Sequence, residues 1–130
     1  MKMHSLLAIM ALGFAFAVAM PAHAEFLNKA SAEKLLNGNT MEGKDFKFGR
    51  EVKIYFATDG AYKKLDDLNN KDTGTWHIVA NGMLCMRGSR HSENCRAIQP
   101  AKKEGKYLLI KNGKKSVRID RVVPGNPHNL

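Results

Sequence analysis

A basic segment around the only two cysteines has the clearest capacity for chemistry in this chain. Its basic side chains are Arg87, Arg90, His91 and Arg96. A guanidinium offers a planar fork of donors that suits a phosphate or a carboxylate, and a loop held by a crosslink loses less entropy when it binds. We therefore predict an anion-binding site on the segment 87–96. The alternative is a solvated hairpin tip whose charges serve solubility.

The spacing of Cys85 and Cys95 favours a disulfide over a metal site or a catalytic thiol. Nine residues separate the two cysteines, so they form no C-x-x-C motif, and no histidine lies at zinc-finger spacing. Such a pair forms a bond in an oxidising compartment. Closing a loop of this length stabilises a fold by about 3 kcal/mol, because the crosslink restricts the unfolded chain.

The remaining side chains predict no catalytic site, no cofactor and no metal site. The serines that follow residue 24 are Ser31, Ser89, Ser92 and Ser116. None of them lies in a G-x-S-x-G motif, and no glycine motif for phosphate binding occurs. The histidines His77, His91 and His128 lie far apart, and the acidic stretch 66–72 lacks the glycine and the closing glutamate of an EF-hand loop. We therefore predict that the protein is not an enzyme.

A second basic group lies near the end of the chain. Its members are Lys111, Lys114, Lys115, Arg118 and Arg121. Arg118 alternates with Val117 and Ile119, which is typical of a strand that turns its charges outward. Neither basic group is interleaved with aromatic residues, so nucleic acid is not an expected partner.

The start of the chain predicts the compartment in which these side chains work. Lys2 precedes an unbroken apolar run over 6–20, and small residues follow it. The run is shorter than the roughly 20 residues that a membrane-spanning helix needs. We therefore predict that residues 1–24 are a signal peptide, cleaved before Glu25, and that the product is periplasmic or secreted without a transmembrane segment. An uncleaved anchor is the alternative.

The chain is strongly basic, and residues 25–130 have the length of a single domain. It carries 21 Lys and Arg against 12 Asp and Glu, a formal net charge of +9, and only Lys2 of these lies in the predicted signal peptide. This charge favours contact with polyanions through long-range attraction that salt screens. The alternative is that the charge serves solubility alone.

The polarity pattern changes from helical to alternating after residue 36. Residues 26–36 suit a short helix, which Asn28 or Ser31 can cap and Asn37-Gly38 ends. Apolar and alternating segments then predict strands at 52–56, 61–65, 75–80, 83–87, 95–99, 107–110 and 117–123. The last residues, 124–130, are expected to form a loose tail.

Short strands joined in order by Asx-Gly turns describe an antiparallel meander of about six or seven strands. Because so few residues must bury an apolar face, we predict a mainly β fold, curled into a small barrel or half-barrel with one short N-terminal helix. The expected core residues are Phe46, Phe48, Tyr55, Phe56, Trp76, Met83, Met86 and Tyr107. An interior filled by side chains is expected at this size, with a ligand cavity as the alternative.

Several short motifs follow one another in a characteristic order. They are Gly38-Asn39-Thr40, Thr58-Asp59-Gly60, Gly74-Thr75-Trp76, Leu84-Cys85, Cys95 and Gly125-Asn126. In this order the chain resembles a small secreted proteobacterial family, the domain-of-unknown-function 995 type. The resemblance implies a periplasmic or secreted β-rich domain, and it implies no established activity.

Together these features predict a noncatalytic exported protein that binds an anionic envelope component or an acidic protein partner through a basic surface. The segment 87–96 is the expected contact. One alternative is a periplasmic inhibitor or immunity-type protein, whose rigid loop would enter the cleft of a hydrolase. Another is a small-molecule carrier, which would require a cavity inside the barrel.

Overall fold

Alternation of apolar and polar residues gives each strand one face for an interior and one for solvent. In the computed structural model, which describes residues 25–130, Val52, Ile54 and Phe56 are buried as that pattern predicts. The elements are α1 (Lys29–Leu36), β1 (Asn39–Asp45), β2 (Glu51–Phe56), β3 (Ala61–Asp66), β4 (Lys71–Ile78), β5 (Leu84–Gly88), β6 (Asn94–Pro100), β7 (Tyr107–Lys111) and β8 (Lys114–Pro124).

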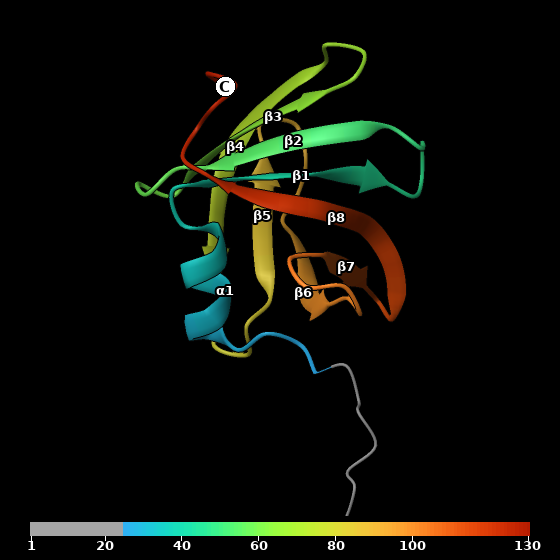
Figure 1. Cartoon of the computed structure of the whole chain (residues 1–130). Coiled ribbons are helices and arrows are strands. Elements are labelled where there is room, and N and C mark those ends of the chain that lie inside the picture. Colours follow the sequence, from blue (N-terminus) through green and yellow to red (C-terminus); the bar gives the residue numbers. More distant parts are fainter. Residues whose placement is uncertain (1–24) are drawn as a thin grey trace, which may run out of the picture.

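The strands form a closed antiparallel barrel in chain order (Figure 1). Each strand pairs with the next, and β8 returns to pair with β1, so every strand of the described part, 25–130, has a partner on both sides. The predicted small β barrel with one N-terminal helix is confirmed. The number of strands differs, because the barrel has eight and the sequence pattern predicted six or seven.

The strand that the pattern missed is β1. Its outward-facing residues Thr40 and Glu42 are buried, so polar side chains stand where a solvated face would be expected. They are covered by the end of the chain: Thr40 Oγ1 donates to the carbonyl of Gly125 (2.7 Å), and His128 Nε2 lies 2.7 Å from Glu42 Oε1. The expected loose tail 124–130 is therefore corrected to a segment held against β1.

One end of the barrel is filled and sealed by α1. Asn28 caps this helix, since its side chain accepts a hydrogen bond from the backbone N–H of Ser31 (2.9 Å). Leu36 of the helix is fully buried in the same core cluster as an edge-to-face pair of Phe56 and Trp76, whose ring centroids lie 5.3 Å apart. The predicted packed interior is present at this end.

Two of the expected core aromatics lie outside the core. Phe46 and Phe48 are 51% and 67% exposed, because they stand in the loop between β1 and β2 and not in a strand. Tyr55, Met83 and Tyr107 are only partly buried.

The predicted disulfide between Cys85 and Cys95 is present and joins directly opposed residues of β5 and β6. Across residues 25–130 we find no helix with the length and hydrophobicity needed to span a bilayer. The predicted signal peptide, 1–24, lies outside the described residues.

The ion pair at Glu42 predicts a pH-dependent contribution to stability. Burial alone would raise the pKa of Glu42, but hydrogen bonds from Arg121 and His128 outweigh burial and hold this pKa below its usual value. A lowered folded-state pKa stabilises the fold above the unfolded pKa, and this contribution is lost as the pH falls through the folded pKa. We expect Glu42→Gln to lower the free energy of unfolding in urea at pH 7 and to lower it much less near pH 3.

The matched control for this test is Glu51→Gln, because Glu51 is exposed on the neighbouring strand. An equal loss of stability from Glu42→Gln at both pH values would contradict the assignment.

Candidate functional site at the open mouth of the barrel

The two ends of the barrel differ. The helix α1 covers one end, shown at the lower left of Figure 1. Four connections meet at the opposite end, which we call the mouth: 46–50, 67–70, 89–93 and the tight turn at 112–113. The mouth is the end at which the interior is reached from outside.

A cavity of about 410 Å³ opens at the mouth. All eight strands contribute to its wall. The deeper wall is apolar and consists of Val52, Ile54, Met86, Leu109 and Val117. The wall nearer the mouth is polar and consists of Asp45, Lys47, Tyr62, Lys64, Asp72, Asn94, Arg96, Lys111 and Ser116, with Phe48 and His91 at the rim.

Arg96 is the most deeply placed cation of this wall. It pairs in register with the buried Leu84, so its side chain shares the inner face of the sheet. Its Nε donates to Ser116 Oγ (2.9 Å), and its two Nη groups make no hydrogen bond within residues 25–130. Burial lowers the pKa of Arg96, which reflects the cost of holding its charge away from water.

A β-bulge brings Ser116 to the inner face. In the pairing of β7 with β8, Leu109 opposes Val117 and Ile110 opposes Lys115, so Ser116 is an extra residue in β8. Both Ser116 and its neighbour Val117 consequently line the cavity, although adjacent residues of a regular strand face opposite ways. The bulge thereby supplies the acceptor that orients Arg96.

A second cation of the cavity wall, Lys111, is also held by a neutral group. Its Nζ donates to Asn94 Oδ1 (2.8 Å) across β6 and β7. A neutral acceptor orients the ammonium group without cancelling its charge.

Tyr62 and Asp72 complete the polar wall. The Tyr62 hydroxyl donates to Asp72 Oδ2 (2.9 Å), and burial together with this carboxylate raises the pKa of Tyr62. The ring fits because its neighbours on β4 and β5 are the opposed glycines Gly74 and Gly88. A Cβ on Gly74 would lie 2.7 Å from the Tyr62 ring and 1.9 Å from the carbonyl oxygen of Arg87.

The charges of the cavity wall do not cancel. Four cationic side chains, those of Lys47, Lys64, Arg96 and Lys111, face the carboxylates of Asp45 and Asp72. Both carboxylates already accept hydrogen bonds, from the Phe48 backbone and from Tyr62. Among the ion pairs within residues 25–130, none includes a cation of this wall.

The structure separates the residues predicted to form one basic site. Arg96 lies inside the barrel and His91 at its rim, where both line the cavity. Arg90 is exposed and lines a second hollow, between the loop 89–93 and residues of β3 and β4. Arg87 is exposed on the outer face of β5, because it lies one residue beyond the inward-facing Met86. The segment 87–96 is therefore not one continuous basic surface.

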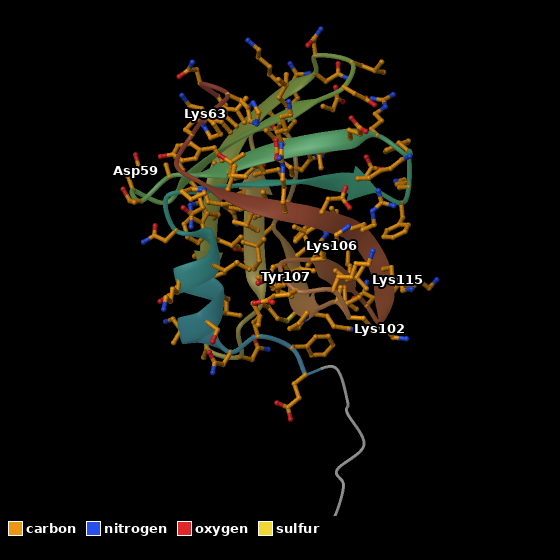
Figure 2. All side chains as sticks on the ribbon, in the orientation of Figure 1. Asp59, Lys63, Lys102, Lys106, Tyr107 and Lys115 are labelled. Atoms are coloured by element: carbon orange, nitrogen blue, oxygen red, sulfur yellow. A yellow bond between two sulfur atoms is a disulfide. The ribbon has the colours of Figure 1, made fainter. Side chains whose placement is uncertain are left out.

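The second basic group also divides between the two faces. Lys111 lines the cavity, whereas Arg118 is exposed and donates to Asp120 (2.8 Å). Other exposed lysines are spread widely over the outside, including Lys63 and Lys102, as Figure 2 shows. The surface charge is thus distributed and not gathered into one patch.

Sequence reasoning missed the other polar residues of the cavity. Tyr62 and Lys64 alternate along β3, and this alternation was available as a signal that both side chains face inward. Ser116 carried no such signal, because its orientation depends on the bulge.

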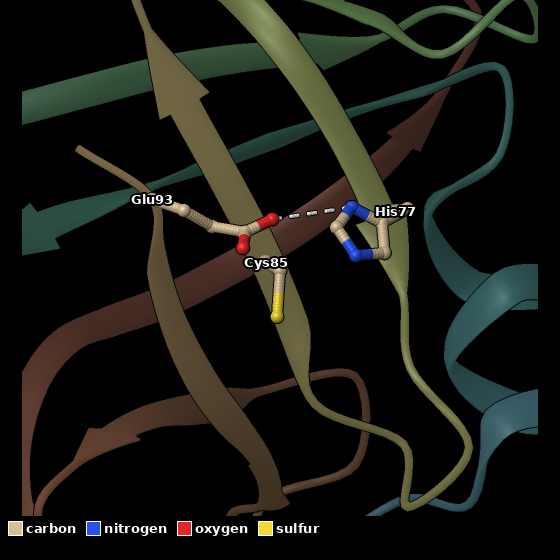
Figure 3. A group of neighbouring side chains, drawn as sticks. All are labelled: His77, Cys85 and Glu93. Atoms are coloured by element: carbon tan, nitrogen blue, oxygen red, sulfur yellow. Dashed lines mark ion pairs between the residues drawn. The ribbon is translucent and has the colours of Figure 1, made fainter. Parts of the chain in front are cut away.

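A small cluster on the outer face resembles a metal site in composition only. The side chains of His77, Cys85 and Glu93 lie together (Figure 3), but the Cys85 sulfur is bonded to Cys95. The two remaining donors are exposed and face each other, with His77 Nδ1 3.6 Å from Glu93 Oε1. Two such donors do not make a metal site.

Two comparisons with known proteins identified no relative of this chain. No protein-family model matches the chain, and a search of curated proteins found no match. The resemblance described above stays a prediction.

The close contact at Gly74 predicts a stability effect. We expect Gly74→Ala to lower the free energy of unfolding by about 1–3 kcal/mol, because β4 and β5 must separate to admit the methyl group. Urea unfolding measures this loss. Thr75→Ala, at the exposed neighbouring position, should cost clearly less, and an equal cost would contradict the proposed crowding.

Proposed function

We propose that this protein is a noncatalytic exported binding protein that takes an anionic small molecule, or the anionic group of a larger one, into the mouth of its barrel. One observation carries the proposal: Arg96 and Lys111 point into the cavity and are held there by neutral acceptors. Both side chains are partly buried, and a cation held partly away from water is costly unless an anion accompanies it, so a bound anion would offset that cost.

The form of the cavity supports a ligand with an apolar part. Its volume of about 410 Å³ is suited to a small molecule. The cations lie toward the mouth, and side chains such as Leu109 and Ile54 form the apolar wall below them. An amphiphile would place its charged group beside Arg96 and its hydrocarbon part deeper in the barrel.

The hydroxyl groups of the wall favour binding over catalysis. Ser116 accepts a hydrogen bond from a guanidinium and donates none to a base within residues 25–130, so it lacks the activation that a nucleophile needs. The Tyr62 hydroxyl donates a hydrogen bond to Asp72, and its raised pKa keeps the phenol neutral. These features support a noncatalytic role.

Two features support a periplasmic or secreted location. The Cys85–Cys95 disulfide is suited to an oxidising compartment, and the pattern of residues 1–24 predicts export. The basic excess of the chain would attract an anionic ligand from a distance.

A matched series of eight-carbon amphiphiles tests the proposal. Octyl phosphate, octanol and octylamine share their hydrocarbon chain and differ in charge. By titration calorimetry we expect octyl phosphate to bind most tightly, and Arg96→Gln or Lys111→Gln to weaken it by about tenfold or more, because each removes a charge-assisted hydrogen bond.

Arg87→Gln is the control, since it removes the same charge from the outer face of the barrel. Equal affinity for the three amphiphiles, or an equal effect of Arg87→Gln, would contradict the proposal. A tight complex with a periplasmic hydrolase that Arg96→Gln leaves intact would favour the inhibitor alternative.

A further inference from the structure

The described residues expose four large apolar side chains, and three of them stand at the mouth. Phe46 is 51% exposed, Phe48 67% and Leu68 62%, on the loops that follow β1 and β3. The fourth, Phe26, is 53% exposed and precedes α1 at the opposite end. Exposed apolar groups gathered at one end of a small domain indicate a contact surface.

The loop that carries the two phenylalanines is held in place by hydrogen bonds. Asp45 Oδ1 accepts from the backbone N–H of Phe48 (2.6 Å), and the backbone N–H of Phe46 donates to the carbonyl of Ser116 (3.0 Å). The exposed rings are thus presented by an ordered backbone, which reduces the entropy lost on binding.

The loop with Leu68 is ordered in the same way and is tied to the first loop. Asp66 Oδ1 accepts from the backbone N–H groups of Leu68 and Asn70 (2.9 Å each). Arg50 Nη1 lies 3.3 Å from Asp66 Oδ2, so an ion pair joins the two loops. Phe48 and Leu68 therefore belong to one connected surface.

Cations are interleaved with the aromatic rings of this surface. Lys47 lies between the two phenylalanines in sequence, and its Nζ is 5.2 Å from the centre of the Phe48 ring. The guanidinium carbon of Arg50 lies 5.6 Å from the centre of the same ring. Arg50 is already paired with Asp66, whereas Lys47 forms no ion pair within residues 25–130. An aromatic ring beside such a lysine suits the interface of an anionic bilayer, where the ring enters the headgroup region and the ammonium group meets phosphates.

We propose that these two loops, which we call the docking loops (46–50 and 67–70), seat the barrel mouth on a membrane that contains anionic lipid. The choice of lipid follows from charge complementarity and from continuity with the cavity, because Lys47 and Phe48 belong to both. The inference deepens the proposed function, on which it rests, by naming a membrane as the source of the anionic amphiphile.

Vesicle co-sedimentation tests the docking, with protein purified after export and its disulfide formed. We expect binding to vesicles of phosphatidylcholine with one quarter phosphatidylglycerol, and weak binding to phosphatidylcholine alone. Phe46→Ser should lower the partition coefficient by about tenfold, since it removes an apolar anchor from the bilayer interface. Phe46 does not line the cavity, so affinity for octyl phosphate should stay unchanged.

Phe26→Ser is the matched control, because Phe26 has a similar exposure at the opposite end of the barrel. Equal binding to the two kinds of vesicle, or equal losses from Phe46→Ser and Phe26→Ser, would overturn the docking surface. Either result would leave the cavity proposal standing if octyl phosphate still binds through Arg96. If Arg96→Gln abolishes octyl phosphate binding and still binds the vesicles, the result would support the cavity and the docking loops as two separate binding sites.

Discussion

Closure of the sheet through the pairing of β8 with β1 is the constraint on which the rest of the structure depends. It gives every strand two neighbours and creates an interior that side chains must fill or line. At the helix end Leu36, Phe56 and Trp76 fill that interior. The end of the chain then covers the outside of β1 through Thr40 and Glu42, so the closing strand is buried on both faces.

At the mouth the interior is lined by side chains and not filled, and this leaves a cavity. Within residues 25–130 no helix covers this end, and its inward positions hold Arg96 and Lys111 among polar side chains. A bulge turns Ser116 inward to hold Arg96, and the pair Gly74 and Gly88 leaves room for Tyr62. The bulge and the glycine pair are local departures from a regular sheet. The bulge orients the charge of Arg96, which supports binding of an anion at this end.

The sequence predicted the features that depend on local pattern. Alternation in β2 assigned Val52 and its partners to the interior, the Asx-Gly pairs marked turns in which Gly60 and Gly82 adopt positive φ, and the cysteine spacing indicated the disulfide. Features that depend on distant pairing were missed. Glu42 is buried because His128 reaches it from 86 residues away, and the inward direction of Arg96 is set by its register with Leu84. A basic residue beside a loop looks the same in sequence whether its strand turns it inward or outward.

The central claim is that Arg96 meets the anionic group of a ligand inside the barrel. The most direct measurement follows the Nε–H resonances of arginine by heteronuclear NMR while octyl phosphate is added. The account predicts a saturable shift of the Arg96 resonance and an unmoved Arg87 resonance, since Arg87 lies on the outer face. An Arg96 resonance that stays in place at saturating ligand, or an equal shift at Arg87, would contradict it.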